Sequence, residues 1–480
     1  MIKARRLFAV TVIAMFIGIS FPYLNHAMDK TYEGLKILID VMTLIRNNYV
    51  EEVEPKKLIY GAAKGMTASL DDYSVFMEPD EYERIKSDTD GEFGGLGIRV
   101  EVRDGWLTVA TPMPGTPAWK AKIMPGDRIV KIDGVSTKDQ TLEDSVKKMR
   151  GIPGTVIKIT ISRAEDSEGK KRTEKELVMK REIIISDNVK WHMIDDKVGY
   201  IKIVGYIKIV EFTGHVTEDF HKAMKDMLAK GMDSLILDLR YNPGGLLTGA
   251  IDISKMFIGD KKMIVYTKGR RKENYQEFRA GSKAPYPDIP LAVLVNRFSA
   301  SSSEIVSGAL QDHKRALIIG ERSFGKASVQ SMIPLSDKSA LKITVAKYYT
   351  PNGRSILRDV KNKTGGIVPD FTVTQTLEKE KQLLLQEQKE DIHYPDESLA
   401  KKTASSDKAG SKNNDISKKS AKEEKVKDEV IIRASELLRA RDVLGKLSQM
   451  NKEAKDASKS EEKKENSAAE NGDKDKKSSK

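Results

Sequence analysis

The feature that most constrains the fold is the alternation of apolar runs with helix-like stretches after residue 185. Most of these runs are long enough for one strand and too short for a buried helix. Strands that alternate with helices along a chain are typical of an α/β domain. We therefore predict an α/β core with strands at Val198–Phe212, Ser234–Leu239, Leu291–Val295, Ala316–Ile319, Ser328–Pro334 and Ala340–Tyr349.

Two regions of different character precede this core. Residues 28–91 place apolar side chains at helical spacing, as in YEGLKILIDVMTLIRNNYV, and predict a helical N-terminal region. Residues 92–165 alternate β-like runs with Gly and Pro, which predicts a compact β-rich module. A short amphipathic helix is expected inside this module at Leu142–Gly151. The core is then expected to occupy residues 166–375.

The N-terminal end reads as a targeting segment. Within residues 1–27, three basic residues stand before an apolar stretch at 7–24. This order is typical of an export signal or of an uncleaved signal anchor. We favour the anchor, because NHA is a poor cleavage site. Either alternative predicts an exported protein, membrane-anchored or periplasmic, with its folded domains outside the cytoplasm.

The C-terminal end is charged and poor in aromatic residues. Residues 376–480 are therefore predicted to be a disordered low-complexity tail. One stretch inside it, EVIIRASELLRARDVLGKL, predicts an isolated amphipathic helix at 429–447. The sequence does not indicate what this helix packs against.

Charge and cysteine content exclude several classes of function. The net charge is +12, but residues 401–480 alone hold 22 Lys and Arg against 16 Asp and Glu. Half of the excess therefore lies in the tail, and no basic face with interleaved aromatics indicates a nucleic-acid partner. The absence of cysteine excludes disulfides, thiol chemistry and Cys-based metal sites. No metal, nucleotide or other cofactor is implied, since RYNPGGLLTG lacks the ending of a phosphate loop.

Four serines in the stretch FSASSSEI lie between an apolar run and a helix-like stretch, where a nucleophile is commonly placed. They are Ser299, Ser301, Ser302 and Ser303. None of the six histidines has a compelling context for a Ser/His/Asp triad. His313, in QDHKR, is interpreted as the end of a helix rather than as a base, although a Ser–His peptidase stays open as an alternative.

A lysine can serve as the base where its amine is kept neutral. The ordinary pKa of a lysine is about 10.4, and burial in an apolar pocket lowers it. Lys326, in IIGERSFGKASVQ, follows a strand and Gly325, whose missing side chain permits a close backbone approach. If Lys326 opens a helical turn, Gln330 lies on the same face and its amide oxygen can hold the amine.

An oxyanion needs backbone N–H donors. The sequence ILDLRYNPGGLLTGAI predicts a strand, a turn with Gly244 and Gly245, and then a helix. Glycines at such a turn leave N–H groups that can point at an anion, although an ordinary strand-to-helix turn has the same sequence signature. A serine just before the helix that follows the serine cluster places further N–H groups at its positive end.

Taken together, these motifs resemble the C-terminal processing peptidases, or tail-specific proteases, over residues 30–375. The matching stretches are SLDDYSVFM, GEFGGLGIRV, PGDRIVKIDG, MRGIPGT, LILDLRYNPGGLL, NRFSASSSEI, GERSFGKASVQ and AKYYTPNGRSI…GGIVPD. The resemblance implies a Ser–Lys serine endopeptidase with a crotonase-like (ClpP/crotonase) α/β core and an inserted PDZ domain. It implies Ser301 as nucleophile, Lys326 as base and Gln330 as the residue that orients the lysine.

The resemblance also assigns the remaining site residues. The oxyanion donors would be Gly244 or Gly245 together with Ser302, which stands where the family has Ala. Ala327 likewise replaces a family glycine. The PDZ loop GGLGI would bind a peptide C-terminus, with the peptide added as a strand; its residues are Gly94, Gly95, Leu96, Gly97 and Ile98.

The function implied is cleavage of protein substrates near their C-termini, with substrate tails captured by the PDZ domain. Arg150, in MRGIPG, is hypothesised to couple the PDZ domain to the core. The expected partners are protein or peptide C-termini and a membrane at the N-terminal segment, and a homo-oligomer or an adaptor is left open. The alternative function is a catalytically silent PDZ-containing binding or scaffold protein.

Overall fold

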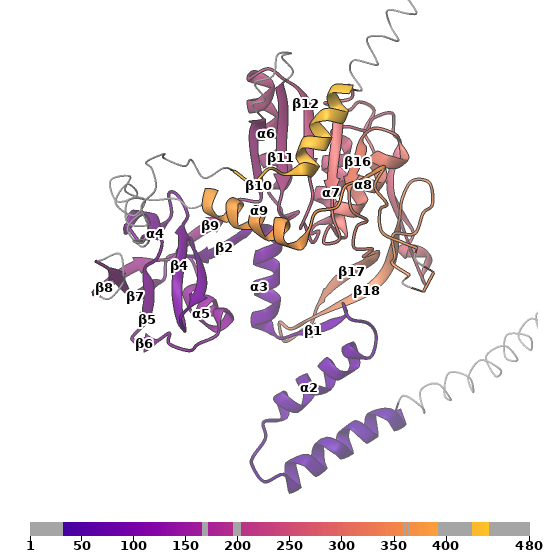
Figure 1. The fold of residues 1–480 in the computed structure, drawn as a ribbon. Helices are drawn as coiled ribbons and strands as arrows, with labels where there is room; N and C mark the ends of the chain where they lie inside the picture. Colours follow the sequence, from indigo (N-terminus) through magenta and orange to yellow (C-terminus); the bar gives the residue numbers. More distant parts are fainter. Residues whose placement is uncertain are drawn as a thin grey trace, which may run out of the picture. The chain divides into compact units, whose positions relative to one another are not determined.

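The structure is a computed structural model that describes residues 32–165, 171–194, 203–359, 361–362, 364–391 and 425–440 (Figure 1). The expected targeting segment lies outside these residues. Within the described part of the chain, no helix is long and apolar enough to cross a membrane. The chain divides into two compact units, one of residues 1–82 and 330–344 and the other of residues 83–329 and 345–480.

The first unit is largely helical, as its sequence predicts. A helix over 32–48 is followed by α2 (Pro55–Ala68), which begins at a proline, a favourable first residue because its fixed φ suits a helix. The strand β1 (Val75–Met77), which the sequence pattern did not predict, pairs antiparallel with the first residues of β18 (Ala340–Tyr349). The Tyr60 hydroxyl donates to Asp337 at 2.8 Å.

In the second unit, α3 (Pro79–Asp90) leads from the first unit into a β-rich module. The main sheet of this module runs in the order β3-β4-β5-β7-β8, and α5 begins at Thr141, whose side chain accepts from the Asp144 N–H. Because β8 pairs with β7 along its length, the sheet does not end at the expected residue 165. The elements are β2 (Glu92–Gly95), β3 (Ile98–Arg103), β4 (Trp106–Pro112), α4 (Pro117–Lys120), β5 (Arg128–Ile132), β6 (Val135–Ser136), α5 (Leu142–Met149), β7 (Val156–Ala164), β8 (Arg172–Lys180) and β9 (Glu182–Ile185).

The α/β core that the sequence predicts is built on a six-stranded sheet. Four of the six predicted strands lie in this sheet, whereas the runs at 328–334 and 340–349 belong to a second, smaller sheet. Its order is β10-β11-β12-β15-β16-β19, with β10 antiparallel to β11 and the other neighbours parallel. The expected start of β11 at Val198 falls outside the described residues. The strands are β10 (Val189–Ile194), β11 (Ile203–Ile209), β12 (Met232–Asp238), β15 (Leu291–Val295), β16 (Leu317–Gly320) and β19 (Phe371–Thr372).

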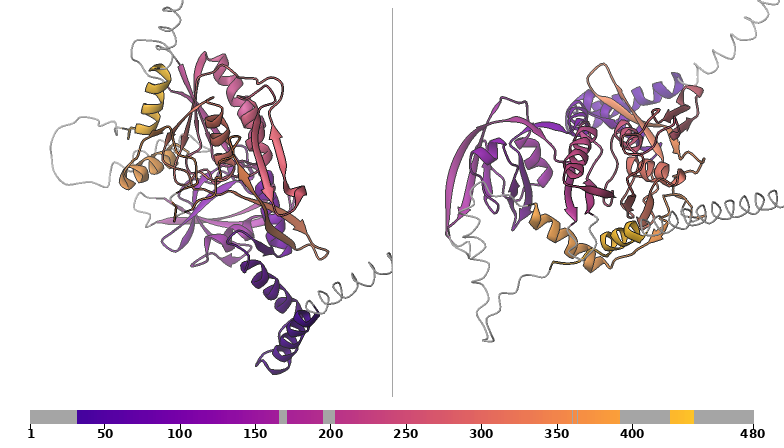
Figure 2. Two further views of the ribbon diagram at one scale, coloured as in Figure 1. Left: turned by 90° about the vertical axis from the view of Figure 1, so that its right-hand side faces the viewer. Right: turned by 90° about the horizontal axis from the view of Figure 1, so that it is seen from above.

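One face of this sheet packs against α6 (Val216–Ala229), α7 (Leu247–Lys255) and α8 (Ser302–Asp312). The opposite face packs against a helix over 429–440, next to α9 (Leu377–Glu390), as the two views in Figure 2 show. The predicted helix at 429–447 is confirmed over its described residues 429–440, although it packs on the sheet and is not isolated. The prediction of a disordered tail is wrong for α9. The physical reason is that the apolar stripe of the 429–440 helix matches an apolar sheet face that would otherwise be open to water.

A smaller sheet is built from segments that alternate with the core strands along the chain. Its strand β13 (Met263–Gly269) pairs with β14 (Gln276–Arg279) and with the last residues of β18, and β17 (Ser328–Pro334) also pairs with β18. Residues 322–327 contain no helix and lead directly into β17. The condition that Lys326 opens a helical turn is therefore not met, because the chain passes from irregular backbone at Lys326 into the strand β17.

Candidate active site

The four serines of the cluster differ in burial. Ser299, Ser302 and Ser303 are buried, and their hydroxyls donate to backbone carbonyls: Ser299 to Leu239, Ser302 to Gly245 and Ser303 to Asn242, at 2.8–3.1 Å. Ser301 is only half-buried. The three buried hydroxyls thus hold the turn in place, and Ser301 is the serine whose side chain can reach a substrate.

Ser301 has an unusual backbone conformation. It precedes α8 as its N-cap residue with φ 52° and ψ −111°, in a region that non-glycine residues rarely adopt. Such a conformation costs about 1–3 kcal/mol and occurs preferentially at functional sites. The sharp turn sets Ser301 at the positive end of an eleven-residue helix, where a developing negative charge is stabilised.

A buried carboxylate connects the two turns that carry Ser301 and Lys326. Glu304 Oε2 accepts from the Ser301 N–H at 2.9 Å and from the Lys326 N–H at 2.8 Å. Its Oε1 accepts from the Ser323 hydroxyl and from the Gly325 N–H, both at 2.6 Å. Burial raises the pKa of Glu304 to about 7, and the four hydrogen bonds oppose this rise. One side chain therefore fixes the backbone of both turns.

Sequence reasoning missed Glu304, although a signal was present. Ser301 and Glu304 have the spacing of a capping box, in which an acidic residue three positions after the N-cap accepts from the N-cap N–H. The pattern predicts that first hydrogen bond. It does not predict the two bonds from the turn at Gly325 and Lys326, because these come from a separate strand end.

The turn before Lys326 depends on glycine. Gly325 has φ +91°, and a Cβ atom there would lie 2.5 Å from the Arg358 Cβ. Ala327, in place of the family's glycine, is fully buried and does not adopt a positive φ, so the turn accepts its side chain. Ser302, in place of the family's alanine, donates its hydroxyl to carbonyls of Gly245 and Leu246. Both departures from the family pattern fit the local structure.

The turn at Gly244 and Gly245 lies against Ser301. A Cβ on Gly244 would stand 2.7 Å from the Ser301 Cβ, and the Gly244 N–H donates to Asn242 Oδ1 at 2.8 Å. Both glycines have positive φ, 111° and 130°, in the region that favours glycine. The structure thus brings the predicted oxyanion turn next to the predicted nucleophile.

The alternative base His313 is at the wrong end of α8. It is the C-cap residue, and an eleven-residue helix separates it from Ser301 by about 18 Å. Its Nε2 lies 2.6 Å from the Met263 carbonyl oxygen. The interpretation of His313 as a helix end is confirmed, and the geometry opposes a Ser–His pair with Ser301.

Gln330 belongs to the first unit, where its amide nitrogen lies 3.4 Å from Thr344 Oγ1. The predicted nucleophile, base and oxyanion donors all belong to the second unit, at turns beside its helices and strands. Ser301 and Ser302 stand at the start of α8, Gly244 and Gly245 follow β12, and Lys326 precedes β17. The role of Gln330 stays a prediction.

The predicted peptide-binding loop lies at an open strand edge. Gly94 and Gly95 belong to β2, and Leu96 and Gly97 turn the chain into β3, which is the edge strand of its sheet. Gly97 has φ +71°, and a side chain there would collide with Thr116. An edge strand next to such a turn can accept a peptide as an additional strand.

The β-rich module and the α/β core, with a serine at a strained helix start, define a PDZ-containing peptidase of the serine type. Three family profiles match the chain: Peptidase family S41 over residues 203–373, a PDZ domain over residues 108–163, and the activating protease CtpB N-terminal domain over residues 22–81. The chain belongs to peptidase family S41, among the carboxy-terminal processing proteases.

Individual relatives agree with this assignment. The chain is 41% identical over 355 residues to the carboxy-terminal-processing protease of Bartonella bacilliformis, covering 73% of this chain and 77% of the relative. It is 33% identical over 374 residues to the carboxy-terminal processing protease CtpB of Bacillus subtilis, covering 77% and 74%. A solved photosystem II D1 C-terminal processing protease is 27% identical, with coverage of 70% and 92% and a TM-score of 0.41. The proteases of Bartonella bacilliformis and Bacillus subtilis support a protease and not the scaffold alternative.

Proposed function

We propose that this protease cleaves its substrates with Ser301 as nucleophile and Lys326 as general base. The observation that carries the proposal is the hydrogen bonding of Glu304, whose Oε2 atom accepts from the backbone N–H groups of both residues. The turn of Ser301 and the turn of Lys326 are therefore both hydrogen-bonded to the same carboxylate oxygen of Glu304. A nucleophile and its base need such fixed mutual placement.

The proposed reaction follows from this arrangement. Lys326, with its amine neutral, takes the proton of the Ser301 hydroxyl while the oxygen attacks the substrate carbonyl carbon. The proton then passes to the leaving amine as the peptide bond breaks, which leaves an acyl group on Ser301. Water hydrolyses this ester with Lys326 again as base. Gln330 would hold the lysine amine through its amide oxygen.

The oxyanion would be stabilised by two backbone N–H groups. Ser302 supplies one, because it is the first residue of α8 and follows the nucleophile directly. Gly245 is the better second donor, because the Gly244 N–H already donates to Asn242. The choice between the two glycines, which the sequence left open, is thus proposed from the geometry of the turn.

We further propose that the PDZ domain captures the C-terminal tail of the substrate at the turn of Leu96 and Gly97, with the peptide added along β3. The match to a PDZ profile and the position of β3 at the sheet edge support this. The basic and apolar residues 1–27 support export, with the catalytic domain outside the cytoplasm and attached to a membrane by this segment. A homo-oligomer or an adaptor stays open.

The test is cleavage of an unfolded model protein with an apolar C-terminus by wild type, Ser301→Ala and Lys326→Ala. We expect activity in the wild type and its loss in both variants, with folding intact by circular dichroism. Cleavage by Ser301→Ala would contradict the nucleophile assignment and direct attention to Ser302. A silent wild type would instead favour a closed state or a binding module.

A further inference from the structure

Two arginines begin the two turns that form the proposed site on the core sheet. Arg240 comes two residues after β12 and leads into the turn with Gly244 and Gly245. Arg297 comes two residues after β15 and leads into the turn with Ser301. Each of the two turns therefore begins at a positively charged arginine. The contacts that fix these two arginines influence the geometry of the proposed site.

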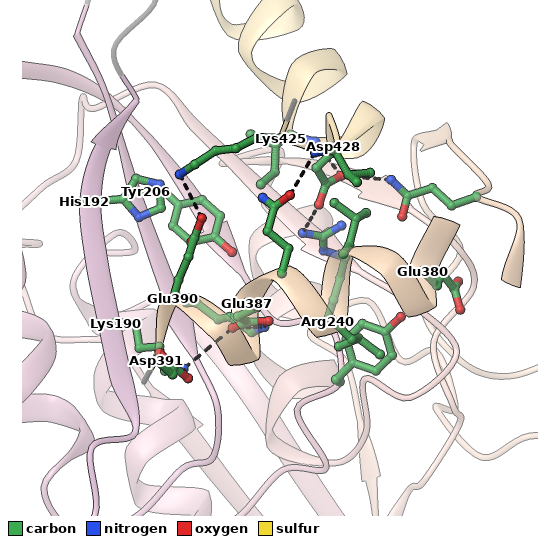
Figure 3. Close-up of a pocket in the computed structure, with 18 of the residues that line it drawn as sticks. Lys190, His192, Tyr206, Arg240, Glu380, Glu387, Glu390, Asp391, Lys425 and Asp428 are labelled. Atoms are coloured by element: carbon green, nitrogen blue, oxygen red, sulfur yellow. Dashed lines mark hydrogen bonds and ion pairs between the residues drawn. The ribbon is translucent and has the colours of Figure 1, made fainter. Parts of the chain in front are cut away.

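Both arginines pair with carboxylates from the C-terminal region. Arg297 donates to both oxygens of Glu380, on α9, at 2.8 and 2.6 Å. Arg240 Nη2 lies 2.8 Å from Asp428 Oδ2, and Figure 3 shows this pair on the wall of a cavity of about 420 Å³. A two-pronged arginine–carboxylate contact fixes orientation as well as position.

The pair at Arg240 is well buried. Arg240 also donates to both oxygens of Asp238, which is fully buried and accepts from the Tyr206 hydroxyl at 2.7 Å. Interaction with Asp238 and Asp428 raises the pKa of Arg240 against the cost of its burial, so the guanidinium stays charged. Removing one partner of such a buried set leaves a charge imperfectly compensated.

Asp428 is itself held in place. Its Oδ1 accepts from the Val430 N–H at 3.0 Å, at the start of the 429–440 helix, and from the Gln375 amide at 3.0 Å. That helix is anchored on the sheet by an apolar stripe of Val430, Ala434 and Leu438, all buried. Asp428 is therefore a fixed charge and not a group at the end of a loose tail.

The two turns also contact each other directly. The Tyr241 and Phe298 rings stack with centroids 5.5 Å apart, and Ala300 N–H donates to the Asn242 carbonyl at 3.0 Å. A shift of either arginine is thereby passed to both turns. Only a few residues of tight turn separate Arg240 from Gly244 and Arg297 from Ser301.

From these contacts we infer that Glu380 and Asp428 are positioning residues for catalysis, which hold the oxyanion and nucleophile turns in register from the back of the sheet. The inference rests on the proposed function of those turns. The C-terminal region then contributes to catalysis indirectly. Glu380 acts through Arg297, and Asp428 acts through Arg240.

The test measures kcat and KM of the full-length protease on the unfolded model protein for Glu380→Gln, Asp428→Asn and the double variant. The matched control is Glu436→Gln, which removes a charge from an exposed Arg433–Glu436 pair on the same helix. We expect kcat per folded molecule to fall about tenfold in each single variant, because small misplacements of reacting groups are costly. KM should stay within about twofold, because tail capture by the PDZ domain is untouched. Asp428→Glu, which keeps the charge, should recover part of the loss.

Several outcomes would overturn the inference. Wild-type kcat in both single variants, or an equal loss in Glu436→Gln, would do so. If a variant is less stable, the assay is run at a lower temperature where circular dichroism shows full folding, and a kcat restored to the wild-type value there would mean a purely structural role. Ser301→Ala is assayed in parallel: cleavage by that variant would overturn the nucleophile assignment and this inference together, whereas its inactivity beside unchanged Glu380 and Asp428 variants would overturn this inference alone.

Discussion

The core sheet and the PDZ sheet use their faces differently. In β15, all five residues of Leu291–Val295 are buried, so side chains on both faces are covered. In β7, buried Ile157 and Ile159 alternate with exposed Val156 and Lys158. The core strand is therefore typical of a parallel sheet between two layers, and the PDZ strand is typical of a sheet with one open face.

This difference explains why a charged C-terminal region contains a folded helix. The helices α6, α7 and α8 cover one face of the core sheet, and the opposite face, which includes Ile236 and Leu294, needs a second layer. The helix over 429–440 supplies it from far along the chain. A sheet apolar on both faces thus indicates a covering segment even where the neighbouring sequence looks disordered.

The largest expected effect tests the comparison itself. Leu294→Ala, on the core face under the 429–440 helix, should lower the free energy of unfolding by about 3 kcal/mol, because it leaves a cavity. Val178→Ala, on the exposed face of the PDZ strand β8, should change it by less than about 0.5 kcal/mol. Urea unfolding measures both. Similar costs at the two sites would contradict the proposed difference between the sheets.

The pH dependence of stability sharpens the comparison, because it probes a buried carboxylate of the core. Burial raises the pKa of Glu304 to about 7, above the ordinary value of 4.5, so the folded state retains a proton that the unfolded state releases. This contribution to stability is fully present below pH 4.5 and is lost as pH rises through 7. Its full size is about 3 kcal/mol. Urea unfolding between pH 4 and 8 should show this slope in wild type and not in Glu304→Gln; equal slopes would contradict it.

The activity of Glu304→Gln should fall by about a hundredfold in kcat, because a 1 Å misplacement can cost this much. A glutamine amide has a single acceptor oxygen. Its NH₂ group would therefore face two of the four groups that now donate hydrogen bonds to Glu304. The assay is cleavage of the unfolded model protein at equal folded fractions. The control is Glu277→Gln, whose carboxylate pairs with Arg279 on β14, away from both turns. A kcat near the wild-type value would show that Glu304 does not position the site.

The smallest effect concerns the contact of Arg150, in the PDZ domain, with α3. Arg150 pairs with Asp88 of α3 at 2.6 Å, and its guanidinium lies 4.3 Å from the Phe93 ring centroid. Arg150→Glu should lower tail-stimulated cleavage about threefold, the size expected for a partly exposed ion pair. Lys158→Glu, within the PDZ sheet, is the control. Unchanged basal and tail-stimulated rates in Arg150→Glu would remove the coupling hypothesis.

Much of the fold and site could be predicted from local pattern. The bounds of β15, β17 and β18 coincide with the predicted runs, because strand periodicity and turn residues act within a few positions. Lys326 was proposed from its turn and Ser301 from the family motifs, and their catalytic roles stay predictions. The helical turn at Lys326, on which the sequence-based placement of Gln330 depended, is absent, since the chain there enters β17, which pairs with β18.

What the sequence by itself determined is the order of the domains, the strands of the core and the turns that carry the proposed catalytic groups. Only the tertiary structure decided that Glu304 joins two of these turns, that the Gly244 N–H is already used, and that the C-terminal helix covers the sheet. The physical reason is the separation in sequence over which each kind of interaction acts. Periodicity and capping depend on neighbours within one helical turn, whereas the partner of a buried carboxylate or of an apolar face depends on segments far apart in the chain, and only folding brings these together.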